Sequence, residues 1–369
     1  MLDLIIKNGT DVYGKSLEIG ISEGEIVEVA DKILQEATDT LVVEDGGIIS
    51  PGWIDSHVHC YEKMTLYYDF PDEIGIKKGV TTVIDAGTSG EKNINDFYDL
   101  AKQAKTNVFA LMNISSPGIV TQDELADLSN INEEKNLKRI NELSDFIIGI
   151  KARMSRTVVG DNDVKPLKMA KALQQKVNHL PLMVHIGSAP PELSDILALL
   201  EKGDIVTHCY NGKLNGILDR DGNIKEFVWD AFYRGINFDI GHGTDSFNFE
   251  VGHTAIEDGL LCKTVSTDIY HRNREDGPVY DLATTLEKML SIGIPLEKII
   301  QMITENPAEI FHLEHKGKLA EGMDADITIF HVENGKKCLI DSNGNKVEID
   351  QQIKPDYAIV AGKIYPVVA

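Results

Sequence analysis

The chain has 369 residues and a formal net charge of −23, because 59 acidic side chains outnumber 36 basic ones. Such an excess of carboxylates repels the phosphates of nucleic acids and anionic lipid heads, so we expect neither as a partner. The apolar fraction of 42%, the absence of a long apolar window and the lack of a signal-peptide pattern predict a globular cytoplasmic protein. Four scattered cysteines predict reduced thiols.

The chain begins and ends with segments that alternate apolar and polar residues between Gly and Asn turns. Residues 2–9, 16–30 and 40–50 have this pattern, and so do residues 324–349 and 356–369. The alternation is typical of antiparallel strands. We therefore predict one small β-sandwich domain that is built from both termini, residues 1–51 and 318–369.

Residues 52–317 alternate short apolar runs with helical patterns, which predicts an α/β fold with parallel strands. The length suits an eight-stranded (β/α)8 TIM-like barrel inserted between the two terminal segments, and a doubly wound open sheet is the alternative. The eight candidate strands are 52–59, 81–87, 107–115, 146–155, 180–187, 204–212, 236–243 and 263–270. The candidate helices are 93–105, 133–146, 166–178, 192–204, 225–235, 251–260 and 281–293.

The sharpest local signal is the pair His57 and His59 at the end of the first candidate barrel strand. Side chains two residues apart on a strand point to the same face, so both imidazoles can reach one metal ion. Such a pair is more often structural when it stands alone.

Three further residues that can bind a metal lie at the ends of later strands: His185, His208 and Asp268. In a barrel of parallel strands these ends meet around one mouth, where the catalytic residues of this architecture collect. Imidazole and carboxylate ligands together suit Zn²⁺ or a similar first-row metal. The sequence therefore predicts a metal centre at the mouth of the barrel.

Lys151 follows the apolar run 146–150 of the fourth strand, so we expect its ammonium group to be buried. A buried amine without a partner loses its charge, and a neutral amine can take up carbon dioxide to form a carbamate that bridges two metals. The alternative is a lysine that reaches the barrel rim or pairs with Asp268. Cys60 and Cys209 directly follow histidines, and strand alternation turns them to the other face, so we interpret both as packing residues.

These motifs resemble the amidohydrolase superfamily of metal-dependent hydrolases over almost the whole chain. The resemblance rests on residues 51–59 (PGWIDSHVH), on the lysine and histidines of the later strands, on Asp268, on Asn306-Pro307-Ala308 and on residues 317–327. The order of two His, Lys, His, His and Asp is similar to that of the binuclear members.

The resemblance implies two divalent ions, most simply Zn²⁺. One would be held by His57, His59 and Asp268, and the second by His185 and His208. A carbon dioxide-derived carbamate on Lys151 would bridge the two. A hydroxide between the ions would attack the substrate, and Asp268 would act as the general acid and base that carries its proton to the leaving group.

Residues 149–153, 208–212, 241–243 and 246–249 resemble a deacetylase branch whose members are often labelled dihydroorotase-like or adenine deaminase. The expected reaction is hydrolysis of an amide or ester bond in a small N-acyl or O-acyl carboxylic acid. Tyr61 occupies the position at which dihydroorotases typically carry an arginine. This difference argues against hydrolysis of cyclic amides. The alternatives are cyclic amide hydrolysis, adenine deamination and a non-catalytic scaffold. The sequence does not determine the oligomeric state, and a homo-oligomer is one of the options.

The sequence offers several substrate contacts beside the metal ligands. Arg153 is the first choice for a substrate carboxylate because it can share the face of Lys151, ahead of Arg156, Arg272 and Arg274. We also expect the mouth to be lined by Tyr210, Asn211, His242 and Gly243. Five further histidines are interpreted as structural or surface residues: His179, His253, His312, His315 and His331.

Overall fold

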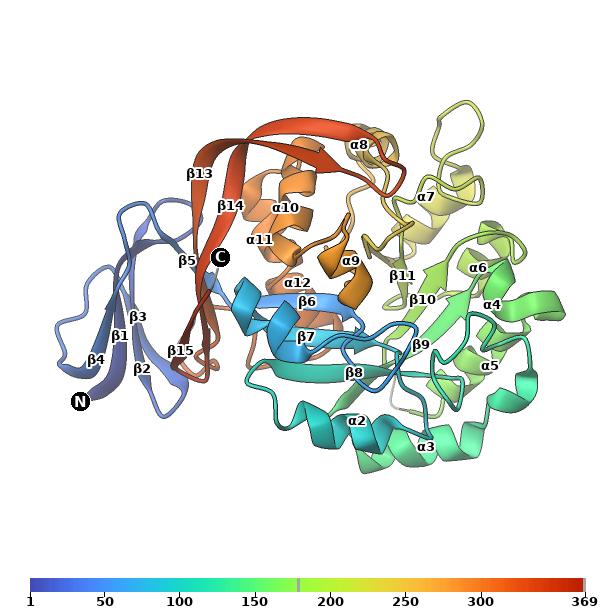
Figure 1. Ribbon diagram of the computed structural model, residues 1–369, viewed down its shortest axis with the longest axis horizontal. Coiled ribbons are helices and arrows are strands. Elements are labelled where there is room, and N and C mark those ends of the chain that lie inside the picture. Colours follow the sequence, from blue (N-terminus) through green and yellow to red (C-terminus); the bar gives the residue numbers. More distant parts are fainter. Residues whose placement is uncertain (178–179, 368–369) are drawn as a thin grey trace.

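The structure is a computed structural model that describes residues 1–177 and 180–367. Within these residues the chain forms a parallel sheet of seven strands and a mixed sheet of eight strands. Figure 1 shows the mixed sheet beside the parallel sheet, with strands from both ends of the chain lying together in it.

The parallel sheet follows the chain order, each strand pairing with the next, as a barrel requires. β6, β7 and β9 are buried along their whole length, as expected of parallel strands that are covered on both faces. The strands are β6 (Trp53–Val58), β7 (Val80–Ala86), β8 (Asn107–Asn113), β9 (Ile147–Met154), β10 (Leu182–Ile186), β11 (Ile205–Thr207) and β12 (Asn237–Asp239).

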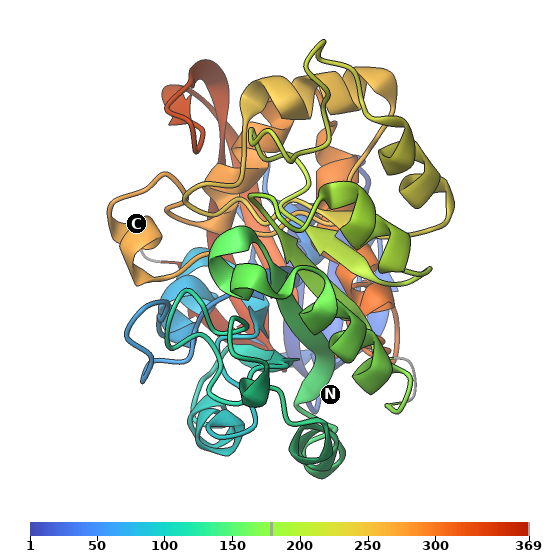
Figure 2. The ribbon, with the colours of Figure 1, turned by 90° about the vertical axis from the view of Figure 1, so that its right-hand side faces the viewer.

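Helices follow the strands and lie around the outside of the parallel sheet (Figure 2). The longer ones are α2 (Ile94–Ala101), α3 (Glu133–Glu142), α5 (Lys165–Gln174), α6 (Leu193–Leu199), α7 (Glu226–Tyr233), α8 (Phe249–Asp258), α10 (Leu282–Ser291), α11 (Leu296–Met302) and α12 (Glu305–Ile310). The short ones are α1 (Pro71–Ile74), α4 (Arg156–Val159) and α9 (His271–Glu275), with 3₁₀ turns at Ile76–Lys78, Leu128–Asn130 and Gly160–Asn162. None of the helices in the described ranges is long and apolar enough to cross a membrane.

The eighth candidate strand, 263–270, is not a regular strand, which corrects the sequence prediction. The segment makes two isolated parallel bridges, Thr264 with Asp239 of β12 and Ile269 with Val58 of β6. It therefore closes the barrel between its first and last regular strands. The backbone φ of Asp268 is +50°, in the left-handed region, and this residue interrupts the extended ladder. The closed TIM-like barrel is confirmed, and the doubly wound alternative is wrong.

The mixed sheet confirms a small β domain assembled from both termini. Its strands are β1 (Leu2–Thr10), β2 (Ser16–Ser22), β3 (Glu25–Ala30), β4 (Ala37–Val42), β5 (Ile48–Pro51), β13 (Ile327–Ile340), β14 (Lys346–Val360) and β15 (Lys363–Pro366). Their apolar faces share a core that includes Ile6, Ile21 and Ile327. The pairing is not antiparallel throughout, since β1 runs parallel to both β4 and β5.

The hairpin β13–β14 is the longest feature of the small domain and reaches across α10 to the mouth of the barrel (red in Figure 1). At its tip, the N–H of Ser342 donates to the Phe247 carbonyl at 3.0 Å, and the N–H of Phe249 donates to the Asp341 carboxylate at 3.0 Å. The hairpin thus attaches the terminal sheet to the loop that follows β12.

Candidate metal centre

The six predicted metal ligands come together at the carboxyl ends of the barrel strands. The imidazole rings form one cluster: the centroid of His57 lies 5.6 Å from that of His59 and 5.2 Å from that of His208, and His185 lies 4.5 Å from His208. The remaining two members, Lys151 from β9 and Asp268 from the closing segment, lie against His57.

Asp268 is the point on which the histidines converge. Its Oδ1 lies 3.3 Å from Nε2 of His57 and 3.0 Å from Nε2 of His59. One ligand atom each from His57, His208 and Asp268 can be chosen so that all three lie within 4.8 Å of one another. His208 and Asp268 both have a positive φ, +69° and +50°, which is uncommon away from glycine and turns each side chain toward the cluster.

Lys151 is buried at the centre of the cluster rather than at the rim. Its Nζ lies 3.2 Å from Nε2 of His57 and 3.3 Å from the Met183 sulfur. Burial lowers the pKa of Lys151 from its usual 10.5 to about 7. A Cβ at Gly87 would come within 2.6 Å of Lys151 Cβ, so the chain leaves this space for the lysine. The amine is therefore available in its neutral form near pH 7.

The electrostatics of the cluster suit a divalent cation. Burial lowers the pKa of His59 and lowers that of His208 to about 3, so both rings are neutral near pH 7. Burial alone would raise the pKa of Asp268, but the neighbouring histidines hold the pKa of its carboxyl well below its usual range. Neutral imidazoles around an ionised carboxylate are the ligand states that Zn²⁺ and related metals need. The residues present therefore fit the metals that the sequence predicts.

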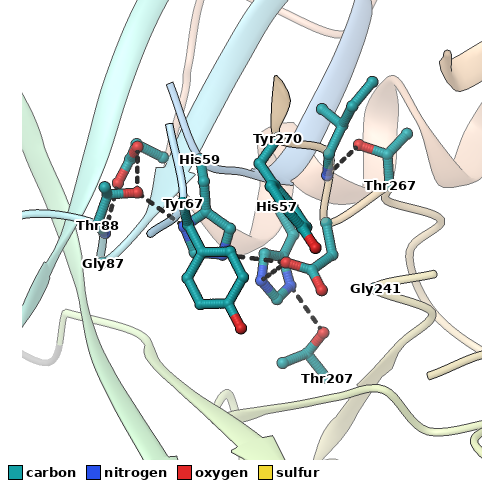
Figure 3. A network of polar contacts seen from close by, with 12 residues as sticks. His57, His59, Tyr67, Gly87, Thr88, Thr207, Gly241, Thr267 and Tyr270 are labelled. Carbon is teal, nitrogen blue, oxygen red and sulfur yellow. Dashed lines mark hydrogen bonds and ion pairs between the residues drawn. The ribbon is translucent and has the colours of Figure 1, made fainter. Parts of the chain in front are cut away.

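Behind the predicted ligands, the described residues include three buried carboxylates that the sequence analysis did not identify. Each accepts a hydrogen bond of 2.6 to 2.7 Å from a threonine hydroxyl, in the pairs Asp55 with Thr267, Asp85 with Thr88 and Asp239 with Thr207. The signal that could have found them is an aspartate inside an apolar strand, where an unpaired charge is costly. Figure 3 shows Thr88 and Thr207 next to His59 and His57.

A cavity of about 500 Å³ opens above the cluster and is lined by His57, His59, Lys151, His185 and Asp268. Tyr67 stacks on His59 with a centroid distance of 5.4 Å and meets Tyr270 edge to face at 4.8 Å (Figure 3). The two aromatic rings form one wall of the cavity beside the predicted metal ligands.

The substrate contacts predicted from sequence are only partly at this cavity. Arg153 lines it, but Nη1 donates to the buried Glu124 carboxylate at 3.1 Å and Nη2 to Gln122 at 2.8 Å. Its guanidinium is therefore already paired within the protein. Of the other arginines considered, Arg272 lines the cavity, whereas Arg274 pairs with Asp69.

Tyr210, Asn211, His242 and Gly243 lie behind the cavity wall, which corrects their interpretation as mouth residues. The Tyr210 hydroxyl donates to the Leu260 carbonyl at 2.6 Å, and the Asn211 amide donates to the His208 carbonyl at 2.7 Å. His242 Nε2 lies 2.8 Å from the buried Nζ of Lys288. A Cβ at Gly243 would come within 2.3 Å of Asp268 Oδ2, so this glycine makes room for Asp268.

Four of the five histidines interpreted as structural, together with Cys60 and Cys209, do not line the cavity. His253, His312 and His315 are exposed, and His331 pairs with Asp356, while His179 lies outside the described residues. Cys60 and Cys209 are buried free thiols that do not line the cavity, as expected for packing residues.

A closed parallel barrel with these ligands at its mouth defines a metal-dependent barrel hydrolase. Comparisons with known proteins agree. The family described as TatD related DNase matches residues 54–312, and a deacetylase-like composite domain matches residues 319–366. The chain belongs to the amidohydrolase superfamily, whose members include its close relatives.

Those relatives carry more than one name. A deacetylase of Enterococcus faecalis is 59% identical over 364 residues, which cover 98% of this chain and 99% of that protein. A deacetylase of Brucella anthropi is 36% identical and covers 92% and 85%. A crystal structure of an adenine deaminase matches with a TM-score of 0.98 and 58% identity, covering 99% of this chain and 100% of that one. A crystal structure of a dihydroorotase matches with a TM-score of 0.91 and 32% identity over 100% and 98%.

Proposed function

We propose that this protein is a binuclear metal hydrolase that cleaves the amide or ester bond of a small N-acyl or O-acyl carboxylic acid. The observation that carries the proposal is the convergence of four imidazoles, one carboxylate and one buried amine on a cavity of about 500 Å³. The two relatives named deacetylase support acyl transfer to water over the other chemistries of the superfamily.

The ligand set divides into two groups. One ion would be held by His57, His59 and Asp268, and the other by His185 and His208. Lys151 in its neutral form would add carbon dioxide through a new N–C bond and release a proton, and the resulting carbamate would supply anionic oxygen ligands to the ions. When bound, divalent ions such as Zn²⁺ would polarise the scissile carbonyl and activate water at neutral pH.

Asp268 would move the proton. Its side chain is 18% exposed and therefore reaches the cavity, whereas His57 is only 1% exposed. An ionised carboxylate at this position can accept a proton from the attacking water and deliver it to the leaving nitrogen or oxygen. Tyr67 and Tyr270 cover one side of the reacting centre and limit the access of bulk water.

The cavity also offers cations for a substrate carboxylate. Arg272 and Lys213 line it, and neither forms an ion pair within 4.0 Å among the residues that the structure describes. Arg153 cannot serve as freely, because Glu124 and Gln122 already occupy its donors. We therefore assign the recognition of the substrate carboxylate to Arg272 and Lys213.

Removing either cation is expected to weaken binding of a substrate anion. Arg272→Met and Lys213→Met should each raise KM about 10-fold for a carboxylate-bearing substrate, since a charge-assisted hydrogen bond is lost, with little change in kcat. Steady-state kinetics on the acid and on its neutral carboxamide measures the effect. Arg156→Met is the control, because Arg156 is exposed and does not line the cavity. An equal rise in KM for the neutral substrate would contradict the assignment.

Metal content and substrate range together test the proposed function. The purified protein should contain about two equivalents of zinc, and a chelator should abolish hydrolysis in a way that added zinc reverses. The substrate panel consists of N-acetyl amino acids, O-acetyl hydroxy acids, cyclic amides and adenine. Hydrolysis of the acetylated acids supports the proposal. Turnover of only the cyclic amides or of adenine, or a stable protein without metal, refutes it.

A further inference from the structure

Each imidazole of the pair His57 and His59 directs its Nδ1 at a buried threonine hydroxyl. His57 Nδ1 lies 2.9 Å from Thr207 Oγ1, and His59 Nδ1 lies 2.7 Å from Thr88 Oγ1. The two threonines come from different parts of the barrel, since Thr207 ends β11 and Thr88 follows β7. The same contact is therefore built twice on unrelated segments (Figure 3).

Each threonine also forms a hydrogen bond with a fully buried carboxylate. The Thr88 hydroxyl donates to Asp85 Oδ2 at 2.7 Å, and the Thr207 hydroxyl donates to Asp239 Oδ2 at 2.7 Å. His57 itself lies 3.8 Å from Asp239 Oδ2, too far for a direct hydrogen bond. The threonine is thus the link between ring and carboxylate in both places.

The number of protons available in each histidine–threonine–aspartate series determines which nitrogen of the imidazole is protonated. A threonine hydroxyl has one proton, and a carboxylate can only accept, so the hydroxyl proton points at the aspartate. The hydroxyl oxygen must then accept a proton from histidine Nδ1. The reverse direction needs a protonated Asp85, whose oxygens already accept the backbone N–H groups of Thr88 and Cys60 at 2.8 Å.

With Nδ1 protonated, Nε2 of each ring carries a lone pair. These two nitrogens face Oδ1 of Asp268 at 3.3 and 3.0 Å, so three acceptor atoms lie together, and the Lys151 amine, 3.2 Å from His57 Nε2, is a donor beside them. Such acceptors repel one another unless a cation lies among them. His208 follows the same rule, because its Nδ1 lies 2.6 Å from the Gly241 carbonyl, which can only accept.

We propose that Thr88 with Asp85, and Thr207 with Asp239, are positioning residues that hold His59 and His57 in the Nδ1–H tautomer and so prepare both Nε2 atoms for a metal ion. This inference rests on the metal centre of the proposed function. Partners of this kind orient metal-binding histidines in other proteins, and their loss typically lowers metal affinity about 10- to 100-fold.

The first experiment reads the tautomers in the metal-free protein. Imidazole nitrogen-15 chemical shifts of histidine-labelled protein should show Nδ1–H for His57, His59 and His208. In Asp85→Asn the amide can donate to Thr88, which turns the hydroxyl toward His59 and should move the proton of that ring to Nε2. A predominant Nε2–H form of His57 or His59 in the unmodified protein overturns the proposal. The measurement on the unmodified protein requires neither activity nor a folded variant.

The second experiment measures zinc affinity by competition with a chelator. Thr88→Val and Thr207→Val keep the side-chain shape but lose the hydroxyl, and each should weaken zinc binding about 10- to 100-fold. Thr88→Ser and Thr207→Ser should restore it, which a purely structural role would not predict. Thr244→Val is the matched control, because Thr244 lines the same cavity but bonds to Tyr270.

The outcomes separate this inference from the proposed function. Valine variants that bind zinc as tightly as the unmodified protein overturn the inference while leaving a binuclear hydrolase intact. An unmodified protein that binds no zinc refutes the proposed function, even where the nitrogen-15 shifts report the expected tautomers.

Discussion

Asp268→Asn is expected to lower kcat about 10³- to 10⁴-fold while the protein keeps its fold. The amide cannot accept the proton that the carboxylate would carry, and it is a weaker ligand for a divalent cation. Because the side chains are nearly the same size, the space that Gly243 leaves for residue 268 stays filled. Kinetics on a saturating acetylated substrate and thermal unfolding of the same sample measure the two effects.

Asp245 provides the matched control for this substitution. It is an exposed carboxylate at the rim of the same cavity, and it makes no hydrogen bond to the predicted ligands within the described residues. Asp245→Asn should change kcat by no more than a few-fold. If Asp268→Asn kept activity comparable to that of this control, Asp268 would have no role in proton transfer.

Lys151→Met is expected to reduce the zinc content from about two equivalents to one or less and to lower kcat about 10²- to 10³-fold. The substitution removes the amine that forms the carbamate, and methionine is an apolar side chain of similar length that a buried site accepts. Elemental analysis and kinetics on the same preparation test both effects. In the unmodified protein, depletion of carbon dioxide during reconstitution with zinc should produce the same loss, and bicarbonate should reverse it.

Lys288 distinguishes a specific role of Lys151 from a general effect of removing a buried amine. Burial lowers the pKa of Lys288 to about 7 as well, but its Nζ bonds to His242 and to the Pro278 carbonyl, away from the cavity. Lys288→Met should therefore keep two equivalents of zinc. Two equivalents in Lys151→Met would show that the lysine does not bridge the ions.

The convergence of the six predicted ligands on one site was predictable because strand geometry is simple. Alternation along β6 places His57 and His59 on one face, and the ends of parallel strands meet at one mouth. Strand alternation no longer predicts the direction of a side chain beyond the end of the strand. His208 and Gly241 have φ values of +69° and +48°, so the chain turns and directs Tyr210 and His242 behind the cavity wall. A pattern of residue types does not reveal such a turn.

Long-range pairing set a second limit. Alternation predicts strands within residues 2–9 and 40–50, but it does not name their partners, and the structure pairs β1 parallel to β4. The roles of Asp85 and Asp239 were hidden for a related reason. Each aspartate is read locally as an interruption of an apolar run, and its threonine and histidine partners become visible only when the barrel closes.

The hairpin β13–β14 also contributes to the mouth of the barrel. Its tip holds the loop after β12 through Ser342 and Asp341, and this loop contains the glycine that makes room for Asp268. All six predicted ligands precede residue 341 in the chain. The loop beside them forms its hydrogen bonds with Ser342 and Asp341 only after the hairpin has folded onto it. Assembly of the site is therefore completed by a segment that follows all six predicted ligands in the chain, and a barrel excised at residue 317 would carry these ligands without the hydrogen bonds from the hairpin.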